Sequence, residues 1–217
     1  MNVAKGRFIS LEGGEGTGKS SQISRLAKHL EGKGLNVIIT REPGGTPAAE
    51  DVRNLLVTGE PDRWDAMSEL LLLYAARRAH VERVIKPALQ RGDWVISDRF
   101  ADSTMAYQGY AMGLGADVVK KAHELALGDF QPDLTLIMDL SVEIGLERAH
   151  ARMLNHAEAE NRYERMGAAF HNCLREAFLD IAENNPDRCV LVDASKSMDD
   201  VSDDIARAVD NHLGACS

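Results

Sequence analysis

Eight residues near the N-terminus have the types and the spacing of a phosphate-binding loop. They fit the pattern G-x-x-x-x-G-K-[ST] at every fixed position. The glycines let backbone N–H groups turn toward phosphate oxygens, and the start of a following helix adds partial positive charge. In such a loop Lys19 reaches the β- and γ-phosphates and the Ser20 hydroxyl ligates Mg²⁺. We therefore expect a nucleoside triphosphate to bind at Gly13, Gly14, Glu15, Gly16, Thr17, Gly18, Lys19 and Ser20.

Charged residues that follow other apolar runs add the parts of a phosphoryl-transfer site. Arg99 can bind the phosphate of an acceptor through two parallel hydrogen bonds, and Arg41 suits the same role. The alternative for Arg99 is an ion pair with Asp98 or another carboxylate, and the alternative for Arg41 is a pair with Glu42. Asp98 can also hold the shell of a Mg²⁺ ion through water. Asp139 ends a further apolar run, where capping of the next helix explains it at least as well.

The elements that must position these residues alternate along the chain. Buried strands are expected at residues 7–11, 35–40, 94–98, 134–139 and 189–193. Helices are expected from about residue 18 and at 47–56, 64–90, 117–127, 142–152, 163–183 and 198–213. Residues 101–115 indicate a polar loop, and residues 153–161 a flexible excursion. The pattern predicts an α/β fold in which a five-stranded parallel sheet carries helices on both faces and ligands at the carboxyl ends of its strands.

Length and composition limit the classes of protein that fit. The 217 residues suit a single domain, 1–217, with a short lid at about 153–162, and 44% hydrophobic residues suffice for a normal core. A net charge of −9 argues against nucleic acid as a partner. No apolar run approaches the roughly 20 residues that span a bilayer. The three cysteines, Cys173, Cys189 and Cys216, have no metal-binding spacing, which favours a reducing, cytoplasmic location without membrane attachment.

Several segments together resemble the bacterial thymidylate kinase (dTMP kinase) family, a group of phosphate-loop nucleoside monophosphate kinases. The resemblance runs from about Phe8 to the last predicted helix. The combination of an Arg-Glu-Pro-Gly-Gly turn with Tyr-Gln-Gly is its most specific part. Beyond the phosphate loop it rests on TREPGGT (40–46), YAAR (74–77), DRF (98–100), STMAYQG (103–109) and GDFQPDLT (128–135).

The resemblance implies a reaction and a set of partners. The expected reaction is ATP + dTMP giving ADP + dTDP with Mg²⁺, carried out by a homodimer. Two alternatives remain open at this point. One is another phosphate-loop kinase acting on a free deoxynucleoside or a different monophosphate. The other is a phosphate-loop regulatory or transport ATPase without a small acceptor, which would not need an acceptor clamp.

The resemblance also implies roles for residues around the acceptor phosphate and sugar. Glu15 would approach the deoxyribose 3′-OH and help to order the Mg²⁺ site. Arg99 and Arg41 would hold the acceptor phosphate. Tyr107 would lie against the sugar and disfavour a ribose 2′-OH, because a bulky ring excludes a hydroxyl effectively.

The base would be recognised by a second group of residues. Arg77 would donate to thymine O4, while Thr104 and Gln108 would contact the rest of the base edge. Family members usually carry an aromatic ring one helical turn before this arginine, but here the residue is Leu73. Leucine can cover a pyrimidine face but forfeits stacking worth ~1 kcal/mol. We therefore expect weaker dTMP binding or looser base choice.

The catalytic arginine is expected outside the phosphate loop. No Arg or Lys occupies positions 14–17, and family members with such a loop usually carry catalytic arginines in the lid. Arg152 and Arg162 are the candidates, and Arg148 would flank the adenine or the phosphates. The segment 161–164 matches the family's Asp-Arg-aromatic-Glu except that Asn161 replaces Asp. The alternative is that Arg148 and Arg152 are surface residues of an amphipathic helix.

Overall fold

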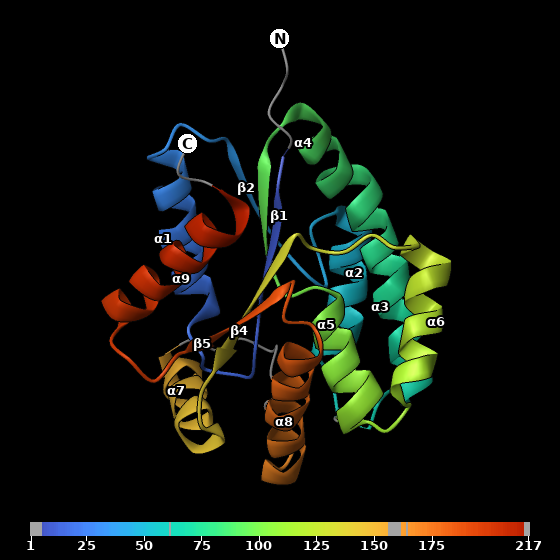
Figure 1. The fold of residues 1–217 in the computed structure, drawn as a ribbon. Coiled ribbons are helices and arrows are strands. Elements are labelled where there is room, and N and C mark those ends of the chain that lie inside the picture. The colour runs from blue at the N-terminus through green and yellow to red at the C-terminus, as the bar shows by residue number, and fades with distance from the viewer. Residues whose placement is uncertain (1–5, 61, 156–161, 164, 215–217) are drawn as a thin grey trace.

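The computed structural model describes residues 6–60, 62–155, 162–163 and 165–214, with the side chains of residues 152–155 left out. Five parallel strands form one sheet in the order β2-β3-β1-β4-β5 (Figure 1). This arrangement confirms the predicted fold class. The strands are β1 (Phe8–Glu12), β2 (Val37–Arg41), β3 (Trp94–Asp98), β4 (Leu134–Asp139) and β5 (Cys189–Asp193).

Helices cover both faces of the sheet, as the strand–helix alternation predicts. Helices α1 and α9 lie on one face, and α3, α6 and α8 lie on the other (Figure 1). The described helices are α1 (Lys19–Glu31), α2 (Pro47–Val57), α3 (Ala66–His80), α4 (Lys86–Arg91), α5 (Ala101–Thr104), α6 (Ala116–Leu127), α7 (Val142–Asn155), α8 (Ala168–Asn184) and α9 (Met198–Leu213), with π-helical turns η1 (Val81–Ile85) and η2 (Met105–Ala111).

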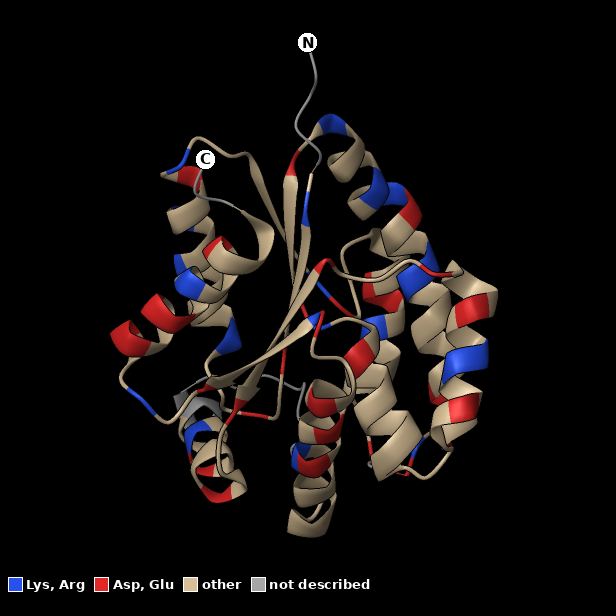
Figure 2. Cartoon of the chain, viewed as in Figure 1, with Lys and Arg blue, Asp and Glu red and all other residues tan. Residues whose placement is uncertain are grey.

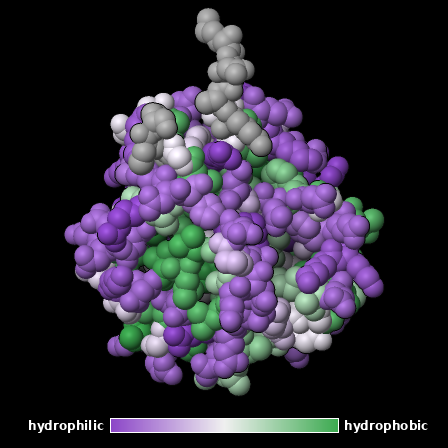
Figure 3. Space-filling view, viewed as in Figure 1, coloured by the Kyte–Doolittle hydropathy of each residue, from purple (hydrophilic) through white to green (hydrophobic). Residues whose placement is uncertain are grey.

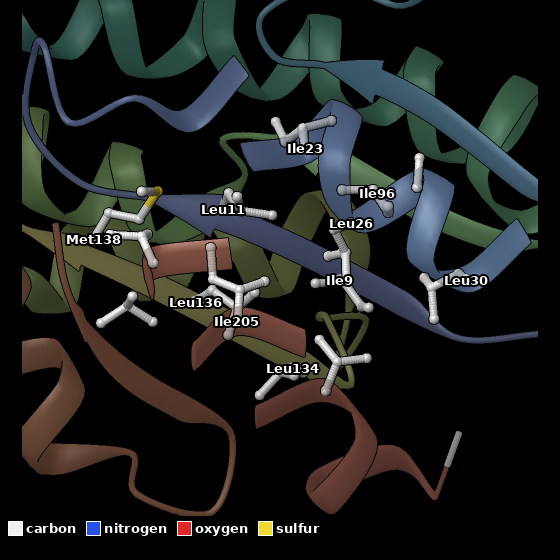
Figure 4. Packing of buried hydrophobic residues seen from close by; sticks show 14 of the residues in the cluster. Ile9, Leu11, Ile23, Leu26, Leu30, Ile96, Leu134, Leu136, Met138 and Ile205 are labelled. Atoms are coloured by element: carbon white, nitrogen blue, oxygen red, sulfur yellow. The ribbon is translucent and has the colours of Figure 1, made fainter. Parts of the chain in front are cut away.

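The apolar core is divided by the sheet, because alternate residues of a strand point to opposite faces. Ile9 and Leu11 of β1 pack with α1 and α9, whereas Phe8 packs on the other face with α3 and α6. Figure 4 shows Ile9 and Leu11 among Ile23, Leu26 and Leu30 of α1 and Ile205 of α9. The phosphate loop is therefore fixed between a buried strand and a buried helix.

The outer surface is mostly polar. The face in Figure 3 is mainly hydrophilic, with an apolar area near its centre. Figure 2 shows acidic and basic residues mixed along the helices in the same view. No helix among the described residues is both long and apolar enough to cross a membrane.

The strand register brings the ends of three strands together. Leu11 of β1 and Arg41 of β2 both pair with Asp98 of β3. The residues that follow these strands therefore meet at one edge of the sheet, where ligands of such folds bind.

Two predicted elements differ in the structure. The segment expected as a polar loop, 101–115, is helical over α5 and η2. Its polar side chains are buried rather than solvated: Asp102, Ser103, Thr104 and Gln108 are all at most 9% exposed. A helix with buried polar residues lacks the apolar period that sequence analysis searches for.

The predicted long helix 64–90 is divided into α3, η1 and α4. Pro87 lies in the first turn of α4 and has no N–H to donate, so the hydrogen-bond register changes before it. The helix predicted at 163–183 begins later, at Ala168 after Gly167. Helix α7 runs to Asn155, so the first residues of the predicted flexible excursion are helical. Residues 156–161 lie outside the described part of the chain.

Candidate active site

The phosphate loop joins β1 to α1 in a conformation that needs glycine. Gly13 and Gly16 have φ of 129° and 69°, in the left-handed region. A Cβ atom on Gly16 would collide with the carbonyl oxygen of Gly145, and one on Gly145 would lie 2.5 Å from the carbonyl oxygen of Glu15. The loop thus packs backbone to backbone on helix α7.

Lys19 folds back over this loop. Its Nζ donates to the carbonyl oxygens of Gly14 and Gly13 at 2.8 and 3.1 Å, and to Thr17 Oγ1 at 3.3 Å. Burial, together with the positive charge of Arg99, lowers the pKa of Lys19 to about 8. Phosphate oxygens are stronger acceptors than carbonyls and would favour the charged ammonium.

A cavity of about 570 Å³ extends from the phosphate loop along the sheet edge. It joins nearly all of the predicted triphosphate, metal and substrate positions in one space. The predicted residues that line it are Glu15, Gly16, Thr17, Gly18, Lys19, Ser20, Arg41, Leu73, Arg77, Asp98, Arg99, Thr104, Tyr107, Gln108 and Arg162.

Arg99 is held in a strained turn at the middle of this cavity. Its φ of 70° is the only positive value at a non-glycine residue in the described chain. Its Nη1 donates to the carbonyl oxygen of Gly13 at 2.9 Å and its Nη2 pairs with Glu15 Oε1 at 2.9 Å. Of the carboxylates that the sequence leaves open for Arg99, the partner is therefore Glu15 rather than the neighbouring Asp98. Tyr107 donates to the same Glu15 oxygen at 3.0 Å.

Glu12, the last residue of β1, stabilises the turn that contains Arg99. It is fully buried and accepts from the Phe100 N–H at 2.6 Å and from the Ser103 hydroxyl at 2.5 Å. Burial and the negative charge of Asp102 raise the pKa of Glu12 to about 8. The sequence analysis missed this residue, although its position at a strand end is a signal.

Arg77 lies at the far end of the cavity in a buried ion pair with Glu42. Arg77 Nε lies 2.6 Å from Glu42 Oε2, and Nη2 donates to Thr104 Oγ1 at 2.9 Å. Glu42 also contacts His80 Nδ1 at 2.9 Å. The sequence leaves open a pair between Arg41 and Glu42. The structure instead pairs the exposed Arg41 with Glu50 at 2.9 Å.

Leu73 lies beside Arg77 in the same wall. The two residues are one helical turn apart on α3, and Leu73 is 8% exposed. Both line the cavity together with Thr104 and Gln108, so the predicted base-binding group is assembled at one place.

Arg162, a candidate lid arginine, lines the cavity and pairs with a buried carboxylate. Its side chain is fully buried, and Nη1 lies 2.5 Å from Glu69 Oε1. It also donates to the carbonyl oxygens of Leu56 and Glu60 at 3.1 and 3.0 Å. The guanidinium is thus directed to α2, α3 and the segment between them. Sequence cannot show this, because Glu69 is 93 residues away and lies in an apolar helix.

Arg148 is not among the described residues that line the cavity. Arg148 is exposed on α7 and donates to the carbonyl oxygen of Ala194 at 3.5 Å. Arg152 lies in the same helix, but its side chain lies outside the described part, as does Asn161. Asp139 forms an ion pair with Arg175 at 2.7 Å, a structural role.

The proposed metal position has few protein ligands. Ser20 Oγ donates to Asp98 Oδ2 at 3.1 Å beside the loop. Among the described residues no group of three or more His, Cys, Asp or Glu side chains is arranged to hold a metal. One hydroxyl and one carboxylate fit Mg²⁺, which keeps several waters and takes phosphate oxygens as ligands.

Comparison with known proteins agrees with this geometry. The family model described as thymidylate kinase matches residues 11–205. The chain belongs to the thymidylate kinase family. It is 51% identical to a thymidylate kinase of Caulobacter vibrioides over 98% of this chain and 100% of that protein, and 50% identical to one of Dinoroseobacter shibae over 92% and 94%. It also resembles the crystal structure of thymidylate kinase from Ehrlichia chaffeensis, with a TM-score of 0.76, 35% identity and coverage of 94% and 99%.

The site residues that are not predicted from the sequence are charged residues that are buried or line the cavity. Glu12, Glu42 and Glu69 are each at most 4% exposed and each orients an arginine or an amide in the site. Arg53 lines the cavity and donates to the carbonyl oxygen of Pro43 at 3.1 Å.

Proposed function

We propose that this protein transfers the γ-phosphate of ATP to dTMP and releases ADP and dTDP. The observation that carries the proposal is the single cavity, which has a phosphate loop at one end and the Arg77–Thr104–Gln108 group at the other. A regulatory ATPase would need only the first end. Family membership supports the same acceptor.

The donor end would bind the triphosphate through the loop. Backbone N–H groups and Lys19 would surround the phosphates, and Ser20 and Asp98 would hold Mg²⁺. When bound, Mg²⁺ neutralises charge that develops between the β- and γ-phosphates. Lys19 would exchange its contacts with Gly13 and Gly14 for phosphate oxygens.

The acceptor phosphate would lie against Arg99. This guanidinium is already oriented by the Gly13 carbonyl and by Glu15, so little conformational freedom is lost on binding. Arg41 would add a second, more exposed cation. Glu15 would approach the sugar 3′-OH, and Tyr107, which donates to Glu15, would exclude a 2′-OH. No general base is needed, because the attacking phosphate oxygen is already ionised.

The catalytic arginine of the lid is proposed to be Arg152. It belongs to α7, the helix that packs on the phosphate loop through Gly145, and Arg148 on that helix would flank the adenine or the phosphates. Arg162 is also a sequence-based candidate for this role. Its burial against Glu69 instead favours a supporting role at the base-binding end.

We propose a homodimer in the cytoplasm. Met67 and Leu71 are exposed one turn apart on α3, at 41% and 62%, and would be covered by a second copy. Cys173 and Cys189 are free thiols, as is usual in a reducing compartment.

An acceptor panel tests the reaction. Labelled ATP is offered with dTMP, dUMP, dCMP, thymidine, or no acceptor, and the labelled products are separated. We expect transfer to dTMP to be the fastest. Transfer to thymidine alone would indicate a nucleoside kinase, and hydrolysis that ignores the acceptor would indicate an ATPase.

A further inference from the structure

Glu69 lies at the base-binding end of the cavity, where it accepts two hydrogen bonds and forms one ion pair. The carboxylate is fully buried on α3. Its Oε2 accepts from Gln108 Nε2 at 2.8 Å and from the Tyr163 hydroxyl at 3.0 Å, and its Oε1 faces the Arg162 guanidinium. The charge is thus compensated inside the protein, and both oxygens are engaged.

This contact fixes the amide of Gln108 in one orientation. The two ends of a glutamine amide have nearly the same shape, so a neighbour must decide which end points where. A carboxylate paired with a guanidinium has no hydrogen to donate. Gln108 must therefore direct its NH₂ group to Glu69, which leaves Oε1 on the opposite side.

Three buried polar atoms at this end of the cavity have no hydrogen-bond partner among the described residues. One is Glu69 Oε1, which faces the Arg162 guanidinium in an ion pair. The other two are Gln108 Oε1, an acceptor, and Arg77 Nη1, a donor. The remaining nitrogens of Arg77 are taken by Glu42, Thr104 and the Phe100 carbonyl. A buried polar group without a partner is costly, so a ligand that meets Gln108 Oε1 and Arg77 Nη1 gains affinity.

We propose that Glu69 is a specificity-determining residue, which selects the imide edge of a pyrimidine by orienting Gln108. Thymine and uracil present a carbonyl oxygen beside a ring N–H, which match the free donor of Arg77 and the free acceptor of Gln108. Cytosine presents an amino group beside an unprotonated ring nitrogen. It would therefore place a donor against the donor of Arg77 and an acceptor against the acceptor of Gln108. Glu69 acts through Gln108 and is a positioning residue. The inference rests on the proposed nucleoside monophosphate acceptor.

The decisive variant is Glu69→Gln, which keeps the shape but lets Gln108 turn over. We expect kcat/KM for dCMP relative to dTMP to rise by about tenfold or more, since a correctly paired buried hydrogen bond contributes about that factor. The ratio for dUMP relative to dTMP should stay within about twofold, because both bases share the imide edge, and the KM for ATP should not change. A general loosening of the site would instead change the dCMP ratio, the dUMP ratio and the KM for ATP together.

Two further variants complete the design. Glu69→Gln leaves Arg162 buried without its charged partner, so the double variant Glu69→Gln/Arg162→Gln repeats the measurement in a neutral network if the single variant does not fold. Glu82→Gln, whose exposed carboxylate pairs with Lys86 on the surface, is the matched control and should leave both ratios unchanged. An unchanged dCMP ratio in a folded variant would overturn the inference. Failure of the wild type to phosphorylate dTMP would instead overturn the proposed function.

Discussion

At the scale of single residues, the site is built from charged side chains whose orientation is fixed by buried carboxylates. Glu12 supports the Arg99 turn, Glu42 holds Arg77, and Glu69 holds Gln108. Desolvation of such carboxylates is expensive and is repaid only by complete hydrogen bonding. The hydrogen bonds of these buried carboxylates fix the orientation of the site's side chains before substrate binds.

Leu73 gives the first prediction at this scale. Leu73→Phe restores a ring that can stack on the base, so we expect the KM for dTMP to fall about fivefold, equivalent to ~1 kcal/mol. Steady-state kinetics with dTMP varied check this, and the KM for ATP should stay constant. Leu125→Phe, at a position 91% exposed, is the control. An unchanged or higher KM for dTMP would show that leucine at position 73 does not weaken the binding of dTMP.

Glu12 gives a prediction about pH. Its pKa is raised from 4.5 to about 8 in the folded protein, so its contribution to stability is complete below pH 4.5 and is lost as the pH rises through 8. Glu12→Gln has no such titration, and the Ser103 hydroxyl can reverse to accept from the new amide. The free energy of unfolding of the variant, relative to wild type, should therefore increase from about pH 5 to about pH 8.

Urea denaturation at several pH values measures this difference. The exposed Glu147→Gln is the control and should show no such trend. A difference that stays constant with pH would mean that Glu12 does not titrate in this window.

Sequence predicts the residues of the site better than their partners. Residues 15–20 of the phosphate loop, Arg99 and the Arg77–Gln108 group follow from spacing and from resemblance, and all line one cavity. Glu69 and Arg162 pair across 93 positions, and no local pattern reports such a contact. Leu73 is visible because it departs from an expected type, whereas the position of Glu12 at a strand end does not reveal which groups it contacts.

At the scale of elements, Arg162 joins parts of the chain that are distant in sequence. It links the end of α2 and the following turn to Glu69 of α3. Helices α5 and η2, expected as a loop, present Thr104 and Gln108 from the opposite wall. The proposed base-binding end is therefore made by helices that are linked to one another, and helices hold side chains more precisely than loops do.

Arg162→Ala tests whether the main role of Arg162 is to link α2 and α3 or to make a catalytic contact. Removing one partner of a buried ion pair costs ~3–5 kcal/mol of stability. In the folded fraction we expect kcat at saturating substrate to fall less than about tenfold, whereas loss of a catalytic arginine costs ~10³-fold. Chemical denaturation and single-turnover kinetics separate the two quantities.

The matched control is Arg165→Ala, because Arg165 pairs with Glu60 at the surface and such pairs contribute only ~0–1 kcal/mol. If Arg162→Ala were as stable as this control but lost about 10³ in kcat, the lid assignment would be right after all.

At the scale of the molecule, the parallel sheet explains why one cavity can hold two substrates. All strands run in the same direction, so the residues after β1, β2 and β3 meet at one edge. This architecture is predictable from sequence, because buried β-branched runs alternate with helical periods. The division of helix 64–90 by the π-helical turn η1 is not, since no break in the apolar pattern marks residues 81–85.

The proposed homodimer is tested on α3. Leu71→Asp puts a charge on the apolar, 62% exposed position, and we expect the sedimenting species to change from dimer to monomer at micromolar concentration. Ile144→Asp, on the exposed side of α7, is the control and should remain dimeric. A monomeric wild type would rule out this interface.

The close packing of Gly16 on Gly145 limits the amino-acid substitutions that these two positions tolerate. Neither glycine has room for a methyl group, so even Gly145→Ala must push α7 away from the phosphate loop. In a saturation-mutagenesis survey, position 145 should thus be as intolerant as Lys19, although it touches nothing that reacts. A map of tolerated substitutions would thus mark the contact between the phosphate loop and α7 at a residue with no side chain.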